Sequence, residues 1–596
     1  MKVEVSLSRG ITKINVNDYR PLMKMNFNGK KIDPKSLRMR EERINIDETN
    51  EGIILSKDLG VKEHVIGLGE KAFGTERRRT RTVMYNTDSF GYGYGTDPLY
   101  VSIPFFISVR GGLPSGLLIN NASSIVFDIG VEDYGKIKIE IPENGSEFYI
   151  IDGKTIEEIV EKLSSLTGKP FKIPGWALGH MISRYSYFPG EKIIKVVDEY
   201  RKFLPVEAVF LDIDYMDRYK NFTWSESFGK PEKLLKEMHK RNVKVITIVD
   251  PSIPVNQKYG PFVRGLGNYC NDENENIYVD SMWPGRCAFP DFLNQKARAW
   301  WSDEIKRWTK KYRIDGIWLD MNEPTRLVDE KGAPLDPDAI HTKDDGTRVK
   351  HSLVHNAYPL LEAKATYDAG VKFILSRSGF IGIQRYAAIW SGDNVSSWED
   401  MRLQIPLLTG LSISGIPYVG CDIGGFSGHS DAELIARYYQ MAAFFPIMRN
   451  HKIKGGNDQE IYALPDKFKG MIQRAVRMRY AFMPYLKELA EEAHRKGHPM
   501  IRPLCYEFQG DEDTYLIDDE YMVGKDVLYA PIVEKGRTSR DVYLPKGKWY
   551  DPWKKESMEG GKWITSNNEM PLFIRSLKGK ERILEALSEI RLDSNS

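Results

Sequence analysis

The central part of this sequence alternates short apolar runs with segments of helical periodicity, and that alternation constrains the fold most strongly. For example, 190-GEKIIKVVDEYRKF-203 and 231-PEKLLKEMHKRN-242 place apolar residues at helical spacing. The strand-like runs lie at 175–183, 206–216, 243–251, 314–323, 371–379, 387–394, 417–426 and 499–508. Because helical connections between successive strands produce a parallel sheet, these eight units predict an α/β fold, a (β/α)8 TIM barrel.

The sequence on either side of this region follows a different pattern. Short apolar runs such as 101-VSIPFFISV-109, separated by Gly, Pro and Asn, are typical of a β-sandwich. Strand-like runs such as 527-VLYAPIV-533 return near the end of the chain. The predicted domains are an N-terminal β-sandwich (1–165), a barrel (166–508) with insertions at 252–294 and 324–353, and a proximal C-terminal β domain (509–596).

Composition excludes several classes of protein. The chain is 41% hydrophobic and 28% charged with a net charge of +2, which gives no sign of a nucleic-acid or membrane partner. Its four cysteines are scattered without a CxxC pair, which argues against a disulfide framework or a zinc knuckle. The N-terminus has no apolar signal region, so the expected compartment is the cytoplasm. The sequence allows a homo-oligomer.

Polar side chains are placed at or near the ends of most of the predicted barrel strands. In a (β/α)8 barrel the active site lies at the carboxyl ends of the strands. Any one of these residues could instead cap the next helix, but converging carboxylates repel one another and are costly to hold without a use. The residues are His180, Asp212, Asp214, Asp250, Asp320, Glu323, Arg377, Asp393 and Asp422.

Aromatic residues accompany these acids and indicate a sugar as the ligand. Carboxylates accept hydrogen bonds from hydroxyl groups and aromatic rings stack on the apolar faces of sugars, although the same rings could simply belong to the core. The aromatic residues are Trp176, Trp283, Trp318, Trp390 and Phe426. Two acids in such a pocket suggest glycoside hydrolysis, in which one stays ionised and the pKa of the other is raised. Strand position alone does not assign the two roles.

Two other functions are compatible with a barrel of this kind. A metal-dependent hydrolase would need several histidines at strand ends, such as an HxH motif, and the sequence has none. A non-catalytic sugar-binding module would keep the aromatic residues but would not need both acids. Activity in the presence of a chelator and turnover of an aryl α-glucoside distinguish these alternatives from a glycosidase.

Two motifs make the sequence resemble glycoside hydrolase family 31, in particular its archaeal α-glucosidases of the maltase type. The segment 316-GIWLDMNEP-324 is similar to the nucleophile signature of that family, and 390-WSGDN-394 is similar to its acid/base signature. The resemblance implies that Asp320 is the nucleophile, that Asp393 is the acid/base, and that Glu323 supports them. It also implies a retaining mechanism that needs neither a metal nor another cofactor.

Further segments match the same family and imply residues that bind the substrate. These segments include 211-LDIDYMDR-218, 376-SRSG-379, 420-GCDIGGF-426 and 445-FPIMRNH-451. An N-terminal loop, 85-YNTDSFGYG-93, is expected to reach over the barrel toward the leaving-group sugar. The implied residues are Asp88, Asp212, Asp214, Trp283, Trp318, Arg377, Trp390, Asp422, Phe426, Arg449 and His451.

The resemblance further implies the substrate class. The form WLDMNEP is similar to α-glucosidases rather than α-xylosidases, so we expect exo-acting release of α-glucose from maltose and malto-oligosaccharides. An α-xylosidase or an α-transglucosidase of the same family is the alternative. Members of the family usually continue past a segment like 570-MPLFIR-575 into more strands, whereas 577–590 has a helical pattern here. We therefore expect the C-terminal β domain to be truncated.

Overall fold

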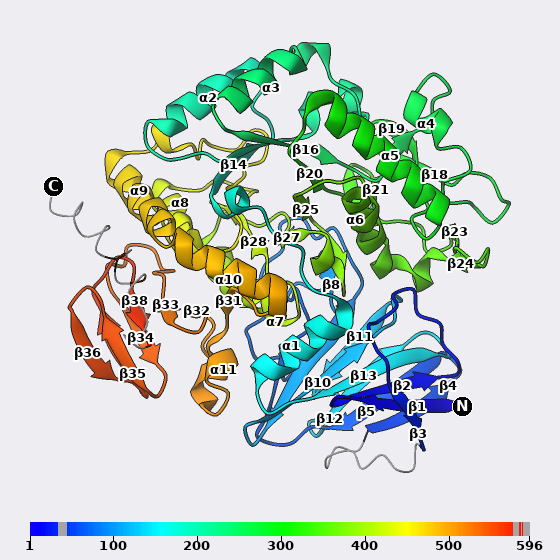
Figure 1. Ribbon diagram of the computed structural model, residues 1–596, viewed down its shortest axis with the longest axis horizontal. Helices are drawn as coiled ribbons and strands as arrows, with labels where there is room; N and C mark the ends of the chain where they lie inside the picture. The colour runs from blue at the N-terminus through cyan, green and yellow to red at the C-terminus, as the bar shows by residue number, and fades with distance from the viewer. Residues whose placement is uncertain (34–43, 576–582, 584, 586, 588–596) are drawn as a thin grey trace.

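The computed structural model describes residues 1–33 and 44–575, together with Ile583, Glu585 and Leu587. Figure 1 shows an N-terminal β region in blue, a central region of helices around a sheet in green and yellow, and a smaller β region in orange and red. The three described residues beyond position 575 are helical, and the rest of the helix predicted at 577–590 lies outside the described residues.

The N-terminal region is a sandwich of two antiparallel sheets, as predicted. Apolar side chains from both sheets, among them Ile14, Leu55, Phe106 and Phe127, form its core. One sheet has the order β3 (Lys30–Ile32), β1 (Val3–Ser8), β2 (Ile11–Val16), β13 (Ser146–Asp152), β10 (Leu113–Ile119), β9 (Phe105–Arg110), β6 (Glu63–Gly67). The other has the order β4 (Ile44–Thr49), β5 (Gly52–Asp58), β12 (Lys136–Ile141), β11 (Ile125–Ile129), β7 (Thr80–Met84).

The central sheet is parallel and its strands are short and mostly buried on both faces, which explains why most of them are apolar. Its strands in chain order are β14 (His180–Arg184), β15 (Ala208–Leu211), β16 (Lys244–Val249), β20 (Gly316–Leu319), β25 (Ile374–Ser376), β27 (Ala388–Trp390), β28 (Val419–Gly420), β29 (Asp422–Ile423) and β30 (Met448–Asn450).

The central sheet closes into the predicted eight-stranded barrel, but its eighth strand is not the predicted one. β28 and β29 flank Cys421 and together form one strand that pairs with β27 on one side and β30 on the other. β30 pairs in turn with β14, which completes the barrel. The prediction of 499–508 as a barrel strand is wrong, because β31 (Ile501–Arg502) pairs antiparallel with β32 (Tyr521–Val523) in the C-terminal sheet.

Helices surround the barrel (Figure 1). Side chains of Asn294, Ser397 and Asp431 cap the amino ends of three of them by accepting a backbone N–H. The helices are α2 (Glu191–Arg201), α3 (Pro231–Lys240), α5 (Gln295–Tyr312), α6 (Tyr358–Asp368), α7 (Trp398–Ile413), α8 (Ala432–Met441), α9 (Asp466–Ala481) and α10 (Met483–Lys496). α1 (Ile156–Thr167) packs against both the sandwich strands β10 and β13 and the barrel helix α10.

The two predicted insertions fold as hairpins that share a small core. The first contains β17 (Ile253–Pro254), α4 (Gly260–Arg264), β18 (Val279–Met282) and β19 (Gly285–Ala288). The second contains β21 (Thr325–Val328), β22 (Lys331–Pro334), β23 (Ile340–Thr342) and β24 (Arg348–Lys350). Cys270, Met282 and Phe289 from the first insertion pack with Leu335 and Ala339 from the second.

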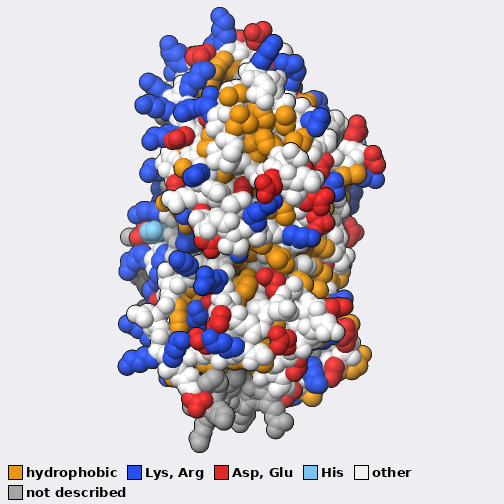
Figure 2. Space-filling view, turned by 90° about the vertical axis from the view of Figure 1, so that its right-hand side faces the viewer, with side chains coloured by type: hydrophobic (Ala, Val, Ile, Leu, Met, Phe, Trp, Pro, Cys, Tyr) orange, Lys and Arg blue, Asp and Glu red, His pale blue; other side chains and the backbone are white. Residues whose placement is uncertain are grey.

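The C-terminal strands lie beside the barrel helices (Figure 1). A six-stranded sheet contains β31, β32, β33 (Val527–Tyr529), β38 (Leu572–Ile574), β35 (Lys548–Asp551) and β36 (Glu556–Glu559), and β34 (Arg540–Leu544) pairs with β37 (Lys562–Ser566). Among the described residues, no helix combines the length and the apolar character needed to cross a membrane. Figure 2 shows basic and acidic side chains interspersed over the face it presents.

Candidate active site

The two acids that we expect to react come from different strands and contact one guanidinium group. Asp320 directly follows β20, and Asp393 lies a few residues beyond β27. Nε of Arg377 lies 3.0 Å from Oδ1 of Asp320, and Nη1 of Arg377 lies 3.6 Å from Oδ2 of Asp393. Two acids far apart in the sequence therefore face the same small volume at the carboxyl end of the barrel.

Arg377 is held in place by Glu323. Its Nε donates to Oε1 of Glu323 at 2.9 Å and its Nη2 donates to Oε2 at 2.8 Å, and Asp88 Oδ2 lies 3.5 Å from Nη2. The Arg377 side chain is only 2% exposed. Two parallel hydrogen bonds to one carboxylate fix the plane of a guanidinium, so Glu323 determines how Arg377 faces the other acids.

The surroundings of Asp320 and Asp393 push their pKa values up to different extents. Burial raises the pKa of Asp320, but Arg377 and the backbone N–H of Met321, which donates at 2.9 Å, favour the charged form. Burial raises the pKa of Asp393 well above its ordinary value, and the charges of Asp320 and Asp88 raise it further while Arg377 opposes them. Asp320 is therefore the acid that ionises more readily.

A second pair of predicted residues lies at the ends of the two strands that flank β14. Asp212 follows β15 and His451 follows β30, and these strands are the two neighbours of β14. Nε2 of His451 lies 3.4 Å from Oδ2 of Asp212, and the His451 ring stacks on Phe426 with centroids 4.8 Å apart. Burial lowers the pKa of His451 well below its ordinary value, which favours the neutral imidazole.

Trp318, Trp390 and Arg449 form a buried layer in which only Trp318 reaches the cavity surface. The rings of Trp318 and Trp390 meet edge to face at 5.6 Å, and the Arg449 guanidinium lies 4.8 Å from the Trp318 ring centroid. Arg449 also pairs with Asp422, whose pKa burial raises to about 6. Trp390, Asp422 and Arg449 thus support the wall of the site from behind.

A cavity of about 680 Å³ brings most of the predicted residues together. Tyr185, Met321, Leu327 and Phe90 add to its wall. The predicted residues that line it are Asp88, Asp212, Trp283, Trp318, Asp320, Arg377, Asp393, Phe426 and His451. Such a volume lies in the range of small-molecule sites and is large enough for a short oligosaccharide.

Asp214 does not line this cavity. After β15 the chain turns through a short 3-10 helix (Ile213–Tyr215), so Asp214 faces a neighbouring cavity of about 590 Å³. There Nζ of Lys454 lies 3.1 Å from Asp214 Oδ2, and the Tyr219 hydroxyl donates to Oδ1 at 3.3 Å. The structure therefore separates Asp214 from the other predicted binding residues.

The N-terminal sandwich contributes one wall of the cavity through the loop that contains Asp88. The strand β8 (Val101–Ser102), at the end of this loop, pairs with β26 (Gly379–Phe380), directly after Arg377 and Ser378. Within the loop, the Gly91 N–H donates to the backbone oxygen of Asp393 at 3.0 Å. Burial raises the pKa of Asp88 to about 6, against the influence of Arg377.

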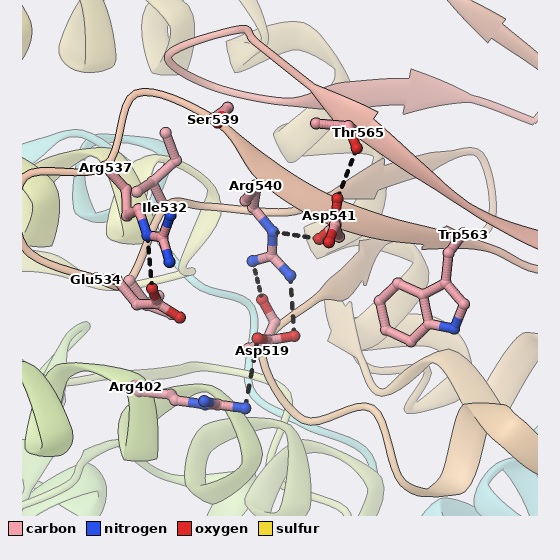
Figure 3. Close-up of a pocket in the computed structure, with 11 residues that line it drawn as sticks. Arg402, Asp519, Ile532, Glu534, Arg537, Ser539, Arg540, Asp541, Trp563 and Thr565 are labelled. Atoms are coloured by element: carbon pink, nitrogen blue, oxygen red, sulfur yellow. Dashed lines mark hydrogen bonds and ion pairs between the residues drawn. The ribbon is translucent and has the colours of Figure 1, made fainter.

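Another cavity, of about 410 Å³, lies in the C-terminal β region (Figure 3). Its charged side chains pair with one another: Arg540 lies 3.0 Å from Asp519, and Arg537 lies 3.1 Å from Glu534. Trp563 lies at one side of the cavity and is 56% exposed. This cavity contains none of the predicted site residues.

Trp283 stands at the tip of the β18–β19 hairpin and is 37% exposed. If it stacks on a sugar beyond the reacting bond, Trp283→Ala should raise KM for maltotriose about two- to tenfold, since such ring contacts contribute about 0.5–1.5 kcal/mol. The rate with p-nitrophenyl α-glucoside should change little. Trp563→Ala is the matched control, and equal effects of both substitutions on maltotriose would contradict a binding role for Trp283.

Sequence reasoning missed two tyrosines and misplaced one histidine. Tyr185 directly follows β14 and lines the cavity, but we assigned His180 as the polar end of that strand. His180 instead begins β14, and its Nδ1 lies 2.8 Å from the Pro205 carbonyl oxygen. The ring of Tyr100 lies 5.1 Å from the Arg377 guanidinium. No motif in the sequence marks Tyr100 as a site residue, because a tyrosine among apolar residues is typical of a hydrophobic core.

A barrel whose strand ends bring two carboxylates and aromatic rings to one sugar-sized cavity is the arrangement of a glycoside hydrolase. The family profile described as the glycosyl hydrolases family 31 TIM-barrel domain matches residues 170–489. Profiles for the C-terminal domain of that family and for its N-terminal galactose mutarotase-like domain match residues 497–577 and 2–128. The chain therefore belongs to glycoside hydrolase family 31.

Characterised relatives agree with this assignment. The chain is 47% identical to an alpha-glucosidase of Saccharolobus solfataricus, over 98% of this chain and 89% of that protein. It is 36% identical to alpha-glucosidase 2 of Bacillus thermoamyloliquefaciens, over 86% of this chain and 66% of the relative. The structure of a family 31 dextranase from Flavobacterium johnsoniae, complexed with isomaltotriose, superposes with a TM-score of 0.88 at 27% identity, covering 96% of this chain and 78% of that chain.

Proposed function

We propose that this glycoside hydrolase is a retaining, exo-acting α-glucosidase that releases α-glucose from the non-reducing end of maltose and malto-oligosaccharides. The unequal environments of Asp320 and Asp393 around Arg377 support the proposal most strongly. A double displacement needs one ionised carboxylate and one protonated carboxyl group at the same bond, and these surroundings favour that pairing.

In the first step, the Asp320 carboxylate attacks the anomeric carbon while Asp393 donates its proton to the glycosidic oxygen, and the leaving sugar departs. In the second step, the Asp393 carboxylate takes a proton from water, which attacks the same carbon and releases Asp320. Two inversions give a product with the starting anomeric configuration. The mechanism requires the two carboxyl groups to lie ~5–5.5 Å apart in the complex with substrate.

Unpaired polar atoms around the cavity also support a hydroxyl-rich ligand. Among the buried atoms in the described part of the chain that have no protein hydrogen-bond partner, Oδ1 of Asp88 and Nε1 of Trp318 belong to residues that line the cavity. Buried polar groups are rarely left unpaired, and glucose hydroxyls can both donate and accept. Asp212 and His451 add an acceptor and a ring nitrogen on the adjacent side of the cavity.

Proton NMR of the first product formed from maltose, isomaltose and an α-xyloside tests the proposal. We expect maltose to be cleaved best, with α-glucose appearing before its mutarotation to the β anomer. Initial release of β-glucose would contradict the retaining mechanism. Preference for the α-xyloside would favour an α-xylosidase, and accumulation of longer oligosaccharides from maltose would favour an α-transglucosidase.

Asp393→Ala should reduce kcat/KM for maltose by about 10²–10⁴-fold, because general acid catalysis contributes that much when the leaving group is poor. The loss should be far smaller with p-nitrophenyl α-glucoside, whose leaving group needs little protonation. Since Asp393 must be protonated in the first step, wild-type kcat/KM should fall as the pH rises through its raised pKa. The variant should lack this alkaline decline, and an equal loss with both substrates would argue against an acid role.

A further inference from the structure

Three histidines form a buried chain of hydrogen bonds between the second insertion and the N-terminal loop. Nδ1 of His341 lies 2.8 Å from Asp291 Oδ1, and its Nε2 lies 2.9 Å from Nδ1 of His351. Nε2 of His351 lies 2.7 Å from Nδ1 of His355, whose Nε2 lies 2.7 Å from the Asn86 carbonyl oxygen. All three imidazoles are fully buried.

The number of protons in this chain follows from its two ends. A carbonyl oxygen and a carboxylate can only accept hydrogen bonds, so His355 must donate to Asn86 and His341 must donate to Asp291. The chain has four hydrogen bonds, but three neutral imidazoles supply only three N–H groups. One further proton is therefore required, and it balances the charge of Asp291.

Burial disfavours a charge on the two rings of the histidine chain that lie farther from Asp291. Burial lowers the pKa of His351 well below its ordinary value and that of His355 to about 4, so neither ring favours the charge. The Cys270 sulfur lies 3.5 Å from Nδ1 and 3.9 Å from Nε2 of His341, beside the ring and off the lone-pair axis of Nδ1. The other groups that face the chain are Tyr85, Tyr358 and, electrostatically, Glu323.

The Asn86 end of the chain fixes the backbone that leads to the active site. Asn356, next to His355, accepts the Asn86 N–H through its side-chain oxygen at 2.9 Å, so both backbone groups of Asn86 are bound. Asp88 lies two residues further on and reaches to 3.5 Å from Arg377. A shift of this backbone would move Asp88 within the cavity.

We propose that His341, His351 and His355, with the added proton that they share with Asp291, are positioning residues that hold Asp88 against the sugar in the leaving-group position. The effect on KM for maltose rests on the proposed α-glucosidase function, but the number of protons in the histidine chain does not. If the proton is lost as the pH rises, Asp291 faces an unprotonated nitrogen of His341 and the two repel each other, so the histidine chain that holds Asn86 loses its anchor at Asp291. Recognition of a sugar leaving group should then decline.

Substitutions at His355 test the positioning role. His355→Leu removes the donor to Asn86 and should raise KM for maltose roughly tenfold to a hundredfold, as small misplacements do, with kcat for p-nitrophenyl α-glucoside largely kept. His355→Gln retains a donor and an acceptor and should restore most of the maltose affinity. His180→Gln, which alters a buried histidine at the other end of the barrel, is the control. If folded His355→Leu shows the wild-type ratio of the two substrates, the positioning role is wrong.

Substitutions at Asp291 test the proton. In Asp291→Asn the side-chain amide can donate to Nδ1 of His341, so the histidine chain needs no added proton. Asp291→Ala leaves that nitrogen without a partner. Relative to p-nitrophenyl α-glucoside, KM for maltose should rise with pH in the wild type and stay constant in Asp291→Asn. Asp291→Asn and Asp291→Ala behaving alike would overturn the proposal.

Direct observation of the wild-type protein remains decisive if a variant fails to fold. In protein labelled with ¹⁵N-histidine, long-range ¹H–¹⁵N spectra at neutral pH should show four ring N–H groups on the three imidazoles. Finding only three would require a neutral Asp291 or a broken hydrogen bond, and would contradict the shared proton on the histidines. If the spectra show four ring N–H groups but the protein does not cleave maltose, the added proton in the histidine chain is confirmed and the proposed function is wrong.

Discussion

Asp320→Ala is expected to lower kcat for maltose by roughly 10⁴-fold or more, as removal of a covalent nucleophile commonly does. In the proposed mechanism, the substitution removes the atom that attacks the anomeric carbon but leaves Asp393, Arg377 and the cavity wall in place. It also removes a buried carboxylate whose pKa burial raises, so we expect the fold to survive. Steady-state kinetics and the midpoint of thermal unfolding measure the two expectations separately.

Azide distinguishes a lost nucleophile from a damaged site. In Asp320→Ala, azide can occupy the space of the carboxylate and attack the anomeric carbon of p-nitrophenyl α-glucoside as p-nitrophenolate leaves. The product should be the β-glucosyl azide. Asp214→Ala is a suitable control, because Asp214 is also an acid that comes shortly after a barrel strand, β15, but it lines the neighbouring cavity. Near-wild-type turnover by Asp320→Ala, or rescue that yields an α-azide, would exclude Asp320 as the nucleophile.

Arg377→Met should be the most destabilising single substitution in the site. Arg377 contacts the carboxylates of Asp88, Asp320, Glu323 and Asp393. Removing one partner of a buried ion pair commonly costs about 3–5 kcal/mol, because the remaining charge stays buried without compensation. We expect a loss of that size in the free energy of unfolding at neutral pH, together with nearly complete loss of activity.

The pH dependence of this loss identifies its cause. Without the cation, the folded-state pKa values of Asp88, Asp320 and Asp393 rise further above their unfolded values. The destabilisation relative to the wild type therefore grows as the pH rises through the wild-type folded-state pKa values, of which that of Asp88 is about 6, and shrinks as the pH falls below them. Urea unfolding at pH 4 and pH 7 measures the difference. Arg479→Met is the matched control, since Arg479 is equally buried but donates to backbone carbonyl groups, so its cost should not depend on pH.

Seven of the eight barrel strands could be predicted from the sequence, because buried parallel strands have a recognisable composition. A buried parallel strand such as β20 is apolar along its whole length, and the acid that follows it marks its carboxyl end. β30 has only three residues, Met448–Asn450, two of them polar, and no periodicity distinguishes it from a loop. The more apolar segment at 499–508 was therefore assigned in its place.

Site residues that directly follow a strand were predicted correctly to line the cavity, whereas the prediction failed for Asp214, which lies in a turn after its strand. Asp212 and Asp320 are adjacent to strand ends, and the cavity contains both. Asp214 lies within the 3-10 helix that follows β15, and this turn directs its side chain into the neighbouring cavity. The reach of Asp88 from the sandwich came only from the family resemblance, because contacts between distant segments leave no local pattern. The same limit hid the histidine chain.

Because β8 pairs with β26, the proposed catalytic cleft is built from two stretches of the sequence, the N-terminal loop and the barrel, which are encoded far apart in the gene. A ribosome finishes the segment containing Asp88 before it makes any barrel strand, so a nascent chain cannot complete its cleft until synthesis has passed His451 and the two stretches have met. Under the proposed function, mutations in the early stretch would alter which leaving-group sugar is accepted during evolution, while the codons for Asp320 and Asp393, much later in the gene, would remain unchanged.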